Sequence, residues 1–273
     1  MKLSLIQMNS VSDKAANIAG AARLIEEAVA SERPDWVLLP EHFDWHGGGK
    51  ADKLRWAERI PGGPAWEMAR SLARKHRIFV HAGSFMESIV GEERIHNTSV
   101  AFNREGEEIA LYRKIHLFDV TAPDGTPYNE SAVVKAGAEL ATYDADGVTI
   151  GCAICYDLRF PALFQALADR GAQLIALPAS FTLQTGKDHW EVLLRARAIE
   201  TECYVAACGQ TGSFKQGSET RWTYGHSMVI DPWGHVVARA SDGVGIVSTR
   251  IEPRRVAKVR ELIPVHRHKK ALA

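Results

Sequence analysis

Three side chains that could take part in catalysis stand at the ends of apolar segments of this chain. Glu41 follows the segment WVLLP, Lys114 closes EEIALYRK, and Cys155 closes GVTIGCAIC. Sites in layered α/β proteins are commonly built at the ends of strands. In such a place a carboxylate can act as a general base, an ammonium group can stabilise an oxyanion, and a thiol can act as a nucleophile.

Each of these roles sets a condition on its side chain. Glu41 can accept and return a proton if burial raises its pKa toward neutrality. Lys114 has to be held in place instead of extending to the surface. Cys155 lies where a strand ends before a helix that begins after Pro161, so its sulfur can be exposed near backbone N–H donors. The ordinary alternatives are a solvated acid, a surface lysine and an inert core thiol.

The four cysteines also allow redox or metal chemistry. Cys152 and Cys155 form a CxxC pair, but a redox pair normally opens a helix, whereas Cys152 lies inside an apolar strand. Residues three apart on a strand point to opposite faces, as do Cys203 and Cys208, five apart on a later strand. We therefore expect neither a dithiol nor a metal site, and we expect Cys152, Cys203 and Cys208 to be core residues.

A histidine could serve as the base for Cys155 in place of Glu41. His116, His189 and His226 are available. The ring of His116 would lie on the same side as Lys114 only if the strand continues through KIHLF. A carboxylate base at position 41 makes a histidine unnecessary.

Apolar periodicity predicts alternating strands and helices around these residues. Asp13 can cap a helix over 13–31, where apolar residues recur at spacings of three and four. Hairpins as well as helical crossovers are predicted, so we expect one α/β domain over 1–273 with mixed sheets and helices outside. The other predicted helices are 64–76, 161–171 and 189–200; the predicted strands are 3–8, 35–40, 78–85, 147–155, 173–180, 203–210, 225–232, 235–240 and 245–251, with a hairpin of 94–102 and 107–114.

Charge and composition argue against several classes of protein. Of the 273 residues, 33 are Lys or Arg and 33 are Asp or Glu, whereas nucleic-acid binders usually carry a basic excess. The basic tail 266–270 is expected to be a solvated end. The N-terminal residues are too few and too polar for a signal peptide, and no apolar run approaches the roughly 18 residues of a membrane span. We expect a cytoplasmic protein with free thiols and no membrane or nucleic-acid partner.

Residues 42–56, HFDWHGGGKADKLRW, do not predict regular structure. Three consecutive glycines followed by charges indicate a mobile loop beside Glu41. Such a loop could close over a ligand, or it could be a surface loop without a role.

Three segments, taken in order, resemble the nitrilase superfamily of carbon–nitrogen hydrolases: LLPEHF (38–43), YRKIHLFD (112–119) and GCAICYDLRFP (151–161). The resemblance extends over nearly the whole chain. It implies a four-layer α-β-β-α sandwich, a homodimer or larger homo-oligomer, and catalysis by Glu41, Lys114 and Cys155. It also implies a second acid between the lysine and the cysteine. That acid is Glu130 here, with Asp119 and Asp124 nearby as alternatives.

Within the superfamily, the chain resembles the Nit branch, which contains deaminated-glutathione amidases and ω-amidases. The resemblance is carried by CYDLRFP, by 180–201 and by YGHSMVIDPWG (224–234). It implies that Arg159 binds a substrate carboxylate and that Phe181 and Thr182 line the pocket. The implied reaction is thiol amidohydrolysis of an α-keto-acid ω-amide, such as deaminated glutathione or α-ketoglutaramate.

The implied mechanism needs no metal or organic cofactor. Cys155 forms a thioester, and the Lys114 ammonium and the backbone N–H of Tyr156 hold the oxyanion. A nitrilase, an N-carbamoyl amino-acid hydrolase or an aliphatic amidase would use the same residues. A non-catalytic binding protein on this fold is the alternative from another class.

Overall fold

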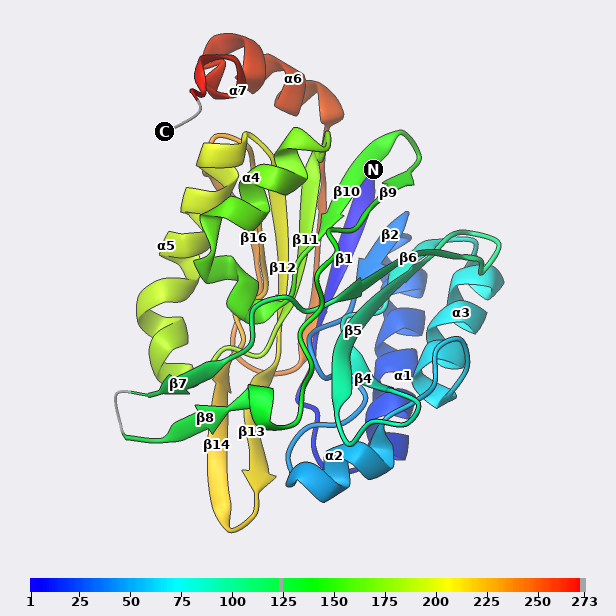
Figure 1. Cartoon of the computed structure of the whole chain (residues 1–273). Coiled ribbons are helices and arrows are strands. Elements are labelled where there is room, and N and C mark those ends of the chain that lie inside the picture. The colour runs from blue at the N-terminus through cyan, green and yellow to red at the C-terminus, as the bar shows by residue number, and fades with distance from the viewer. Residues whose placement is uncertain (123–124, 271–273) are drawn as a thin grey trace.

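A computed structural model describes residues 1–122 and 125–270. Two mixed sheets lie face to face, with α1 (Lys14–Glu32) and α3 (Pro64–His76) covering one and α4 (Pro161–Asp169) and α5 (Leu183–Thr201) covering the other (Figure 1). The architecture is the predicted four-layer α-β-β-α sandwich.

The first sheet has the order β17-β1-β2-β3-β5-β4, and β6 also pairs with β5. β1, β2 and β3 are parallel to one another, whereas β17 and β5 run antiparallel to their neighbours, so this sheet is mixed. Its strands are β1 (Lys2–Gln7), β2 (Trp36–Leu38), β3 (Phe79–His81), β4 (Phe85–Ser88), β5 (Ile95–Phe102), β6 (Glu108–Arg113) and β17 (Gly245–Arg250).

The second sheet has the order β16-β15-β12-β11-β10-β9 and is also mixed. β10, β11 and β12 are parallel, and antiparallel strands flank them on both sides. Its strands are β9 (Thr142–Ala145), β10 (Val148–Cys152), β11 (Leu174–Ala179), β12 (Tyr204–Gly209), β15 (Met228–Ile230) and β16 (Val236–Arg239).

Alternation along the central strands of the first sheet builds its two apolar faces. On β1, Leu3 and Leu5 pack in the core shared with the second sheet, whereas Ile6 packs with the residues of α1 and α3. On β2, Trp36 faces the second sheet and Val37 faces the helices. Successive side chains of a strand point to opposite faces of the sheet. When both faces are buried, the sequence of each central strand is therefore a continuous apolar run.

Helix ends follow the local signals in the sequence. The Asp13 side chain accepts a hydrogen bond of 3.0 Å from the Ala16 N–H at the start of α1, as predicted. Proline at the first helical position begins α3, α4 and α6 (Pro253–Leu262), where its missing N–H has no intrahelical partner to lose.

Three element predictions need correction. The strand predicted over 78–85 is broken into β3 and β4, because the chain turns at Gly83, whose φ of 48° and whose close approach to the Pro40 carbonyl suit only glycine. The helix predicted over 189–200 begins earlier, at Leu183. The strand predicted to reach Cys155 ends at Cys152.

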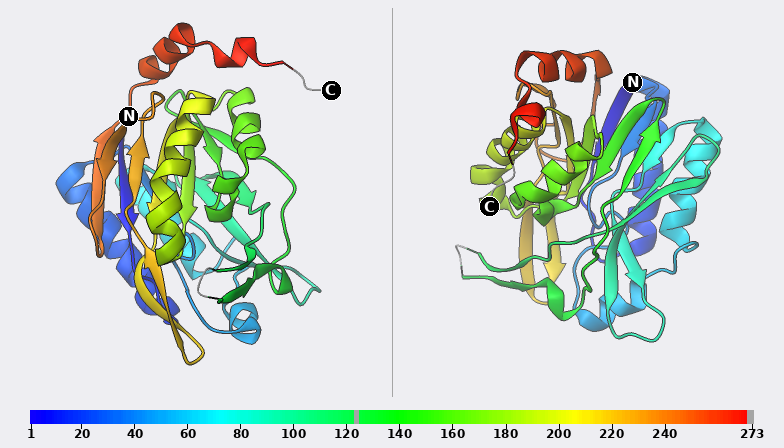
Figure 2. Two further views of the ribbon diagram at one scale, coloured as in Figure 1. Left: turned by 90° about the vertical axis from the view of Figure 1, so that its left-hand side faces the viewer. Right: turned by 45° about the horizontal axis from the view of Figure 1, so that its top comes forward.

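The short elements gather at the two ends of the sandwich. The pair β7 (Asp119–Thr121) and β8 (Pro127–Asn129), the hairpin β13 (Thr211–Gln216) and β14 (Glu219–Tyr224), and α2 (Lys50–Trp56) lie at one end. Helices α6 and α7 (Val265–His268) lie across the other end (Figures 1 and 2). Among the described residues, no helix is both long and apolar enough to span a bilayer.

Candidate active site

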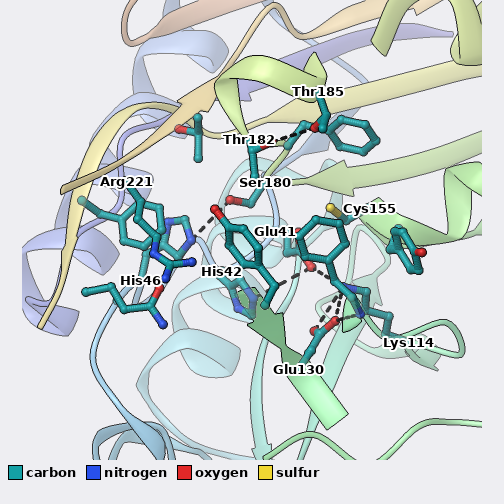
Figure 3. A pocket seen from close by; sticks show the side chains of 18 of the residues that line it. Glu41, His42, His46, Lys114, Glu130, Cys155, Ser180, Thr182, Thr185 and Arg221 are labelled. Carbon is teal, nitrogen blue, oxygen red and sulfur yellow. Dashed lines mark hydrogen bonds and ion pairs between the residues drawn. The ribbon is translucent and has the colours of Figure 1, made fainter. Parts of the chain in front are cut away.

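All eight predicted site residues line one pocket, at the end of the sandwich that carries β7, β8, β13, β14 and α2. The pocket has an empty volume of about 1060 Å³, part of it open to solvent. Figure 3 shows Glu41, Lys114, Glu130 and Cys155 pointing toward one another on one side of it.

Glu41 is buried just beyond the end of β2. Its Oε1 accepts hydrogen bonds from Lys114 Nζ at 3.0 Å and from Asn97 Nδ2, on β5, at 2.9 Å. Its backbone carbonyl accepts a hydrogen bond of 3.0 Å from Gln210 Nε2, so the second sheet also fixes its position. The side chain is 3% exposed, which excludes the alternative of a solvated acid.

The pKa of Glu41 differs from the sequence-based expectation. Burial alone would raise the pKa of this carboxyl, but the Lys114 ammonium outweighs it, with help from His42 and the Cys155 thiol, and lowers the pKa from 4.5 to about 2. Burial therefore does not raise the pKa of Glu41 toward neutrality, which was the condition that we set from the sequence for a base at this position. Glu41 is a carboxylate at any ordinary pH, and it is ready to accept a proton.

Lys114 follows β6 and lies between two carboxylates. Its Nζ donates to Glu41 Oε1 at 3.0 Å and to Glu130 Oε1 and Oε2 at 3.1 and 2.9 Å. Burial opposes its charge, but Glu130 and Glu41 outweigh burial and raise the pKa of Lys114 well above its usual value. Lys114 is therefore a fixed ammonium and does not extend to the surface.

Glu130 is the acid that the structure places against Lys114. It begins a short 3₁₀ helix, Glu130–Ala132, and its Oε2 also accepts a hydrogen bond of 2.6 Å from the Phe118 N–H. Asp119 instead accepts from the Ser131 N–H at 2.9 Å. Asp124 lies outside the described residues.

Cys155 opens a 3₁₀ helix, Cys155–Arg159, three residues beyond the end of β10. Its φ of 47° is unusual for a residue with a Cβ, and such strain is typical of functional positions. The first residues of a helix, here Cys155 and Tyr156, have backbone N–H groups without intrahelical acceptors, and these can donate to an oxyanion beside the sulfur.

The Cys155 thiol is neutral in the resting site. Burial and the neighbouring Glu41 carboxylate raise its pKa well above 9, and Lys114 only partly opposes them. The Glu41 carboxylate therefore lies close enough to the thiol to act on its pKa, which is the arrangement that a base for Cys155 needs.

Asp157, which the sequence reasoning did not single out, ties this turn to the segment that carries Lys114. Its Oδ1 accepts from the N–H and the Nδ1 of His116, at 3.1 and 2.7 Å. Its Oδ2 accepts from Tyr112 Oη at 2.7 Å and from the Ile154 N–H at 2.8 Å. The carboxylate is fully buried, and it therefore fixes the nucleophile turn relative to Lys114.

Replacing Asp157 by asparagine is expected to lower both stability and turnover. The new NH₂ group would face two donors, and each buried donor left without an acceptor costs about 1–3 kcal/mol. Urea denaturation measures the loss, and Asp169→Asn at an exposed ion pair with Lys269 is the control. If Asp157→Asn matched Asp169→Asn in stability and kcat, Asp157 would have no positioning role.

The remaining cysteines and His116 take structural places. Cys152, Cys203 and Cys208 are buried free thiols, as expected, and none of them lines the pocket. The His116 ring bonds Asp157 and stacks on Phe160, with 3.7 Å between centroids, and so does not act as a base for Cys155.

One group of side chains could hold a metal ion within the described part of the chain. Potential ligand atoms of Glu41, His42 and Glu130 lie within 4.8 Å of one another. The Lys114 ammonium contacts both carboxylates, so a cation already occupies the place between them, and the site can supply a base, a nucleophile and oxyanion donors by itself.

The predicted substrate-binding residues lie on the α5 side of the pocket. The Arg159 guanidinium lies 5.5 Å from the Phe181 ring centroid and 6.0 Å from that of Tyr156, and its Nη2 contacts His189 Nδ1 at 3.3 Å. Thr182 hydrogen-bonds to Thr185 at 2.7 Å. Among the described residues no carboxylate pairs with Arg159, so its remaining donors can bind an anion.

The first part of segment 42–56 packs beside the pocket, and its later residues are more exposed. Phe43, Asp44 and Trp45 are buried, and the His46 ring stacks on Phe214 with 3.7 Å between centroids. Its last residues form α2, which the sequence did not predict. This helix brings Lys53 to the pocket.

Comparison with known proteins gives one family. A family model described as "Carbon-nitrogen hydrolase" matches residues 2–261. The chain is 40% identical over 267 residues to a deaminated glutathione amidase of Synechocystis (strain PCC 6803 / GT-S), covering 97% of this chain and 96% of that protein. It is 37% identical to the human omega-amidase NIT2, covering 99% of this chain and 95% of the relative.

Solved structures show the same fold. The Nit3 protein of Saccharomyces cerevisiae, a member of the nitrilase superfamily, has a TM-score of 0.86 and 31% identity, covering 97% of this chain and 94% of its own. The Caenorhabditis elegans NitFhit protein has a TM-score of 0.88 and 38% identity, and this chain covers 65% of it. The fold expected from the sequence is confirmed.

Proposed function

This chain belongs to the carbon–nitrogen hydrolase family and is an amidase, and we propose that it cleaves the ω-amide of an α-keto acid through Cys155. The observation that carries this proposal is the Glu41 carboxylate that raises the pKa of the neighbouring Cys155 thiol, beside a Lys114 ammonium held by Glu130. The names of the relatives support the substrate class.

In the first half of the reaction, Glu41 takes the thiol proton as the sulfur attacks the amide carbonyl. The negative charge moves from Glu41 to the carbonyl oxygen, which the Lys114 ammonium and the Tyr156 N–H stabilise. Lys114 faces Glu41 and Glu130 before this step, and it faces the oxyanion and Glu130 after it. Because Lys114 faces two negative charges in both states, moving a proton onto Glu41 costs less than its low pKa alone would imply. Glu41 then protonates the leaving nitrogen, and the C–N bond breaks.

In the second half, water attacks the thioester on Cys155. Glu41 removes a proton from the water, the same donors hold the second oxyanion, and the acid leaves as the thiol regains its proton. Glu130 touches no reacting atom; it positions Lys114 and keeps it charged. These side chains supply every step without a metal or an organic cofactor.

We propose that Arg159 binds the carboxylate of the acyl part. Arg159→Met is then expected to raise KM for carboxylated amides, with a loss of kcat/KM of roughly 10- to 100-fold, as for a hydrogen bond to a charged group. Steady-state kinetics on α-ketoglutaramate and on a neutral amide of equal length measure it. Equal losses on the two substrates would show that Arg159 has a structural role instead.

Ammonia release from a substrate panel tests the proposed reaction. The panel contains α-ketoglutaramate, an N-carbamoyl amino acid, an aliphatic amide and a nitrile. We expect the highest kcat/KM for α-ketoglutaramate. A preference for any other member would assign the same Cys155 machinery to that reaction.

Three further proposals concern the whole molecule. We propose that residues 1–273 form one domain, which the family match over 2–261 supports. We also propose that the chain forms a homodimer or larger homo-oligomer. Exposed apolar side chains on α5 and at the end of α6, among them Val192 and Leu262, support this proposal. Sedimentation velocity measures the size of the assembly and tests it. We propose a cytoplasmic location, which four free cysteines support.

A further inference from the structure

Arg221, on β14, carries hydrogen-bond donors that nothing satisfies. Its guanidinium lies 4.4 Å from the Tyr128 ring centroid, and its Nη2 donates to Glu219 Oε2 at 3.0 Å. Its Nε and Nη1 are buried and have no partner among the described residues. Buried guanidinium donors left without acceptors are costly, so they indicate a place for an anionic ligand.

Lys53, on α2, is a second cation that lines this pocket. Its Nζ is in no salt bridge and donates no hydrogen bond within residues 1–122 and 125–270. Burial lowers the pKa of Lys53; the carboxylates of Glu130 and Glu41 oppose this effect, and the positive charges of Lys114 and Arg221 add to it. Two cations that face one cavity repel each other until an anion binds between them.

These two cations stand apart from Arg159. Arg159 belongs to the nucleophile turn and contacts residues of the α5 side, whereas Arg221 and Lys53 come from β14 and α2. In Figure 3, Arg221 lies on the opposite side of the pocket from Lys114 and Cys155. The pocket therefore extends past the reacting sulfur toward a second positive region.

We propose that Arg221 and Lys53 form a second carboxylate subsite that binds the amine part of the substrate. This inference rests on the proposed function, which places the acyl carboxylate at Arg159. An amide has an acyl part and an amine part, so a second anion-binding region serves the part that leaves. A primary amide releases ammonia and has nothing to occupy it. The preferred substrates are then N-substituted ω-amides whose leaving amine ends in a carboxylate, a class that includes deaminated glutathione.

A matched pair of substrates tests the subsite. The first is deaminated glutathione, and the second is the same molecule with its glycine carboxylate converted to a carboxamide. Release of cysteinylglycine or its amide is followed for both. The wild-type protein is expected to prefer the carboxylate by roughly 10- to 100-fold in kcat/KM, as for a charge-assisted hydrogen bond.

Arg221→Met and Lys53→Met are expected to bring that ratio close to one, and Arg221→Lys to restore part of it. Lys50→Met, which removes an exposed lysine from the same helix, is the control and should keep the wild-type ratio. A wild-type ratio near one, or an unchanged ratio in Arg221→Met, would overturn the subsite. Failure of the proposed function is a different result: the wild type would cleave neither α-ketoglutaramate nor either member of the deaminated-glutathione pair.

Discussion

Replacing Cys155 by alanine is expected to lower kcat on the order of 10⁶-fold, the magnitude seen when a hydrolase loses its nucleophile. The side chain is buried in the pocket, the neighbouring Glu41 carboxylate raises the pKa of its thiol, and its backbone is held in a strained conformation at the start of a 3₁₀ helix. Removing the sulfur leaves the oxyanion donors in place, but without a nucleophile no tetrahedral oxyanion forms for them to stabilise. Product formation by enzyme at high concentration measures the residual rate.

Cys152→Ala is the matched control for this variant. Cys152 is an equally buried thiol three residues away on β10, and burial raises its pKa to about 12, but it does not line the pocket. We expect a stability loss similar to that of Cys155→Ala and activity close to that of the wild type. If Cys152→Ala were as inactive as Cys155→Ala, the loss at position 155 would reflect damage to the core.

Glu41→Gln is expected to lower kcat about 10²- to 10⁴-fold, the usual contribution of a positioned general base. The substitution is nearly isosteric, and the amide oxygen can still accept from Asn97 Nδ2 and Lys114 Nζ. The fold should therefore remain while the proton acceptor is lost. Activity within tenfold of the wild type would show that another group removes the thiol proton.

The pH dependence of stability provides a second measurement on the same variant. The pKa of Glu41 is about 2 in the folded protein, below its ordinary value of 4.5. Such a group stabilises the fold fully above pH 4.5, and this contribution is lost as the pH falls toward 2. In urea titrations the wild type should therefore exceed Glu41→Gln by a constant margin above pH 4.5 and by a shrinking margin below it. A margin that grows on acidification would contradict the stabilising role of Lys114.

Much of the fold could be predicted because its signals are local. Apolar runs predicted most strands of the two sheets, and the Asp13 cap predicted the start of α1. The order Glu41, Lys114, Cys155 resembles that of the nitrilase superfamily, and from this resemblance we predicted three residues that the structure brings together in one pocket. The strand before Cys155 was predicted too long, since the apolar run continues for three residues beyond Cys152, where the strand ends.

The surroundings of Glu41, Lys114 and Cys155 could not be predicted from the sequence because they depend on contacts between distant segments. Asp157 is one acidic residue in a polar turn until Tyr112 and His116 meet it. The low pKa of Glu41 depends on Lys114, which lies 73 residues away. Lys53 and Arg221 lie on α2 and β14, and these two elements could not be predicted because their sequences are polar or follow a glycine-rich stretch.

Peptide mapping of acid-quenched reactions tests the central claim most directly. During turnover of α-ketoglutaramate, the peptide that contains Cys155 should gain the mass of the acyl group, because a thioester replaces the thiol proton. The added mass should vanish when the substrate is exhausted, and no such adduct should form in Cys155→Ala. Product formation with the acyl group on another residue, or with no adduct on Cys155 at any quench time, would contradict this account.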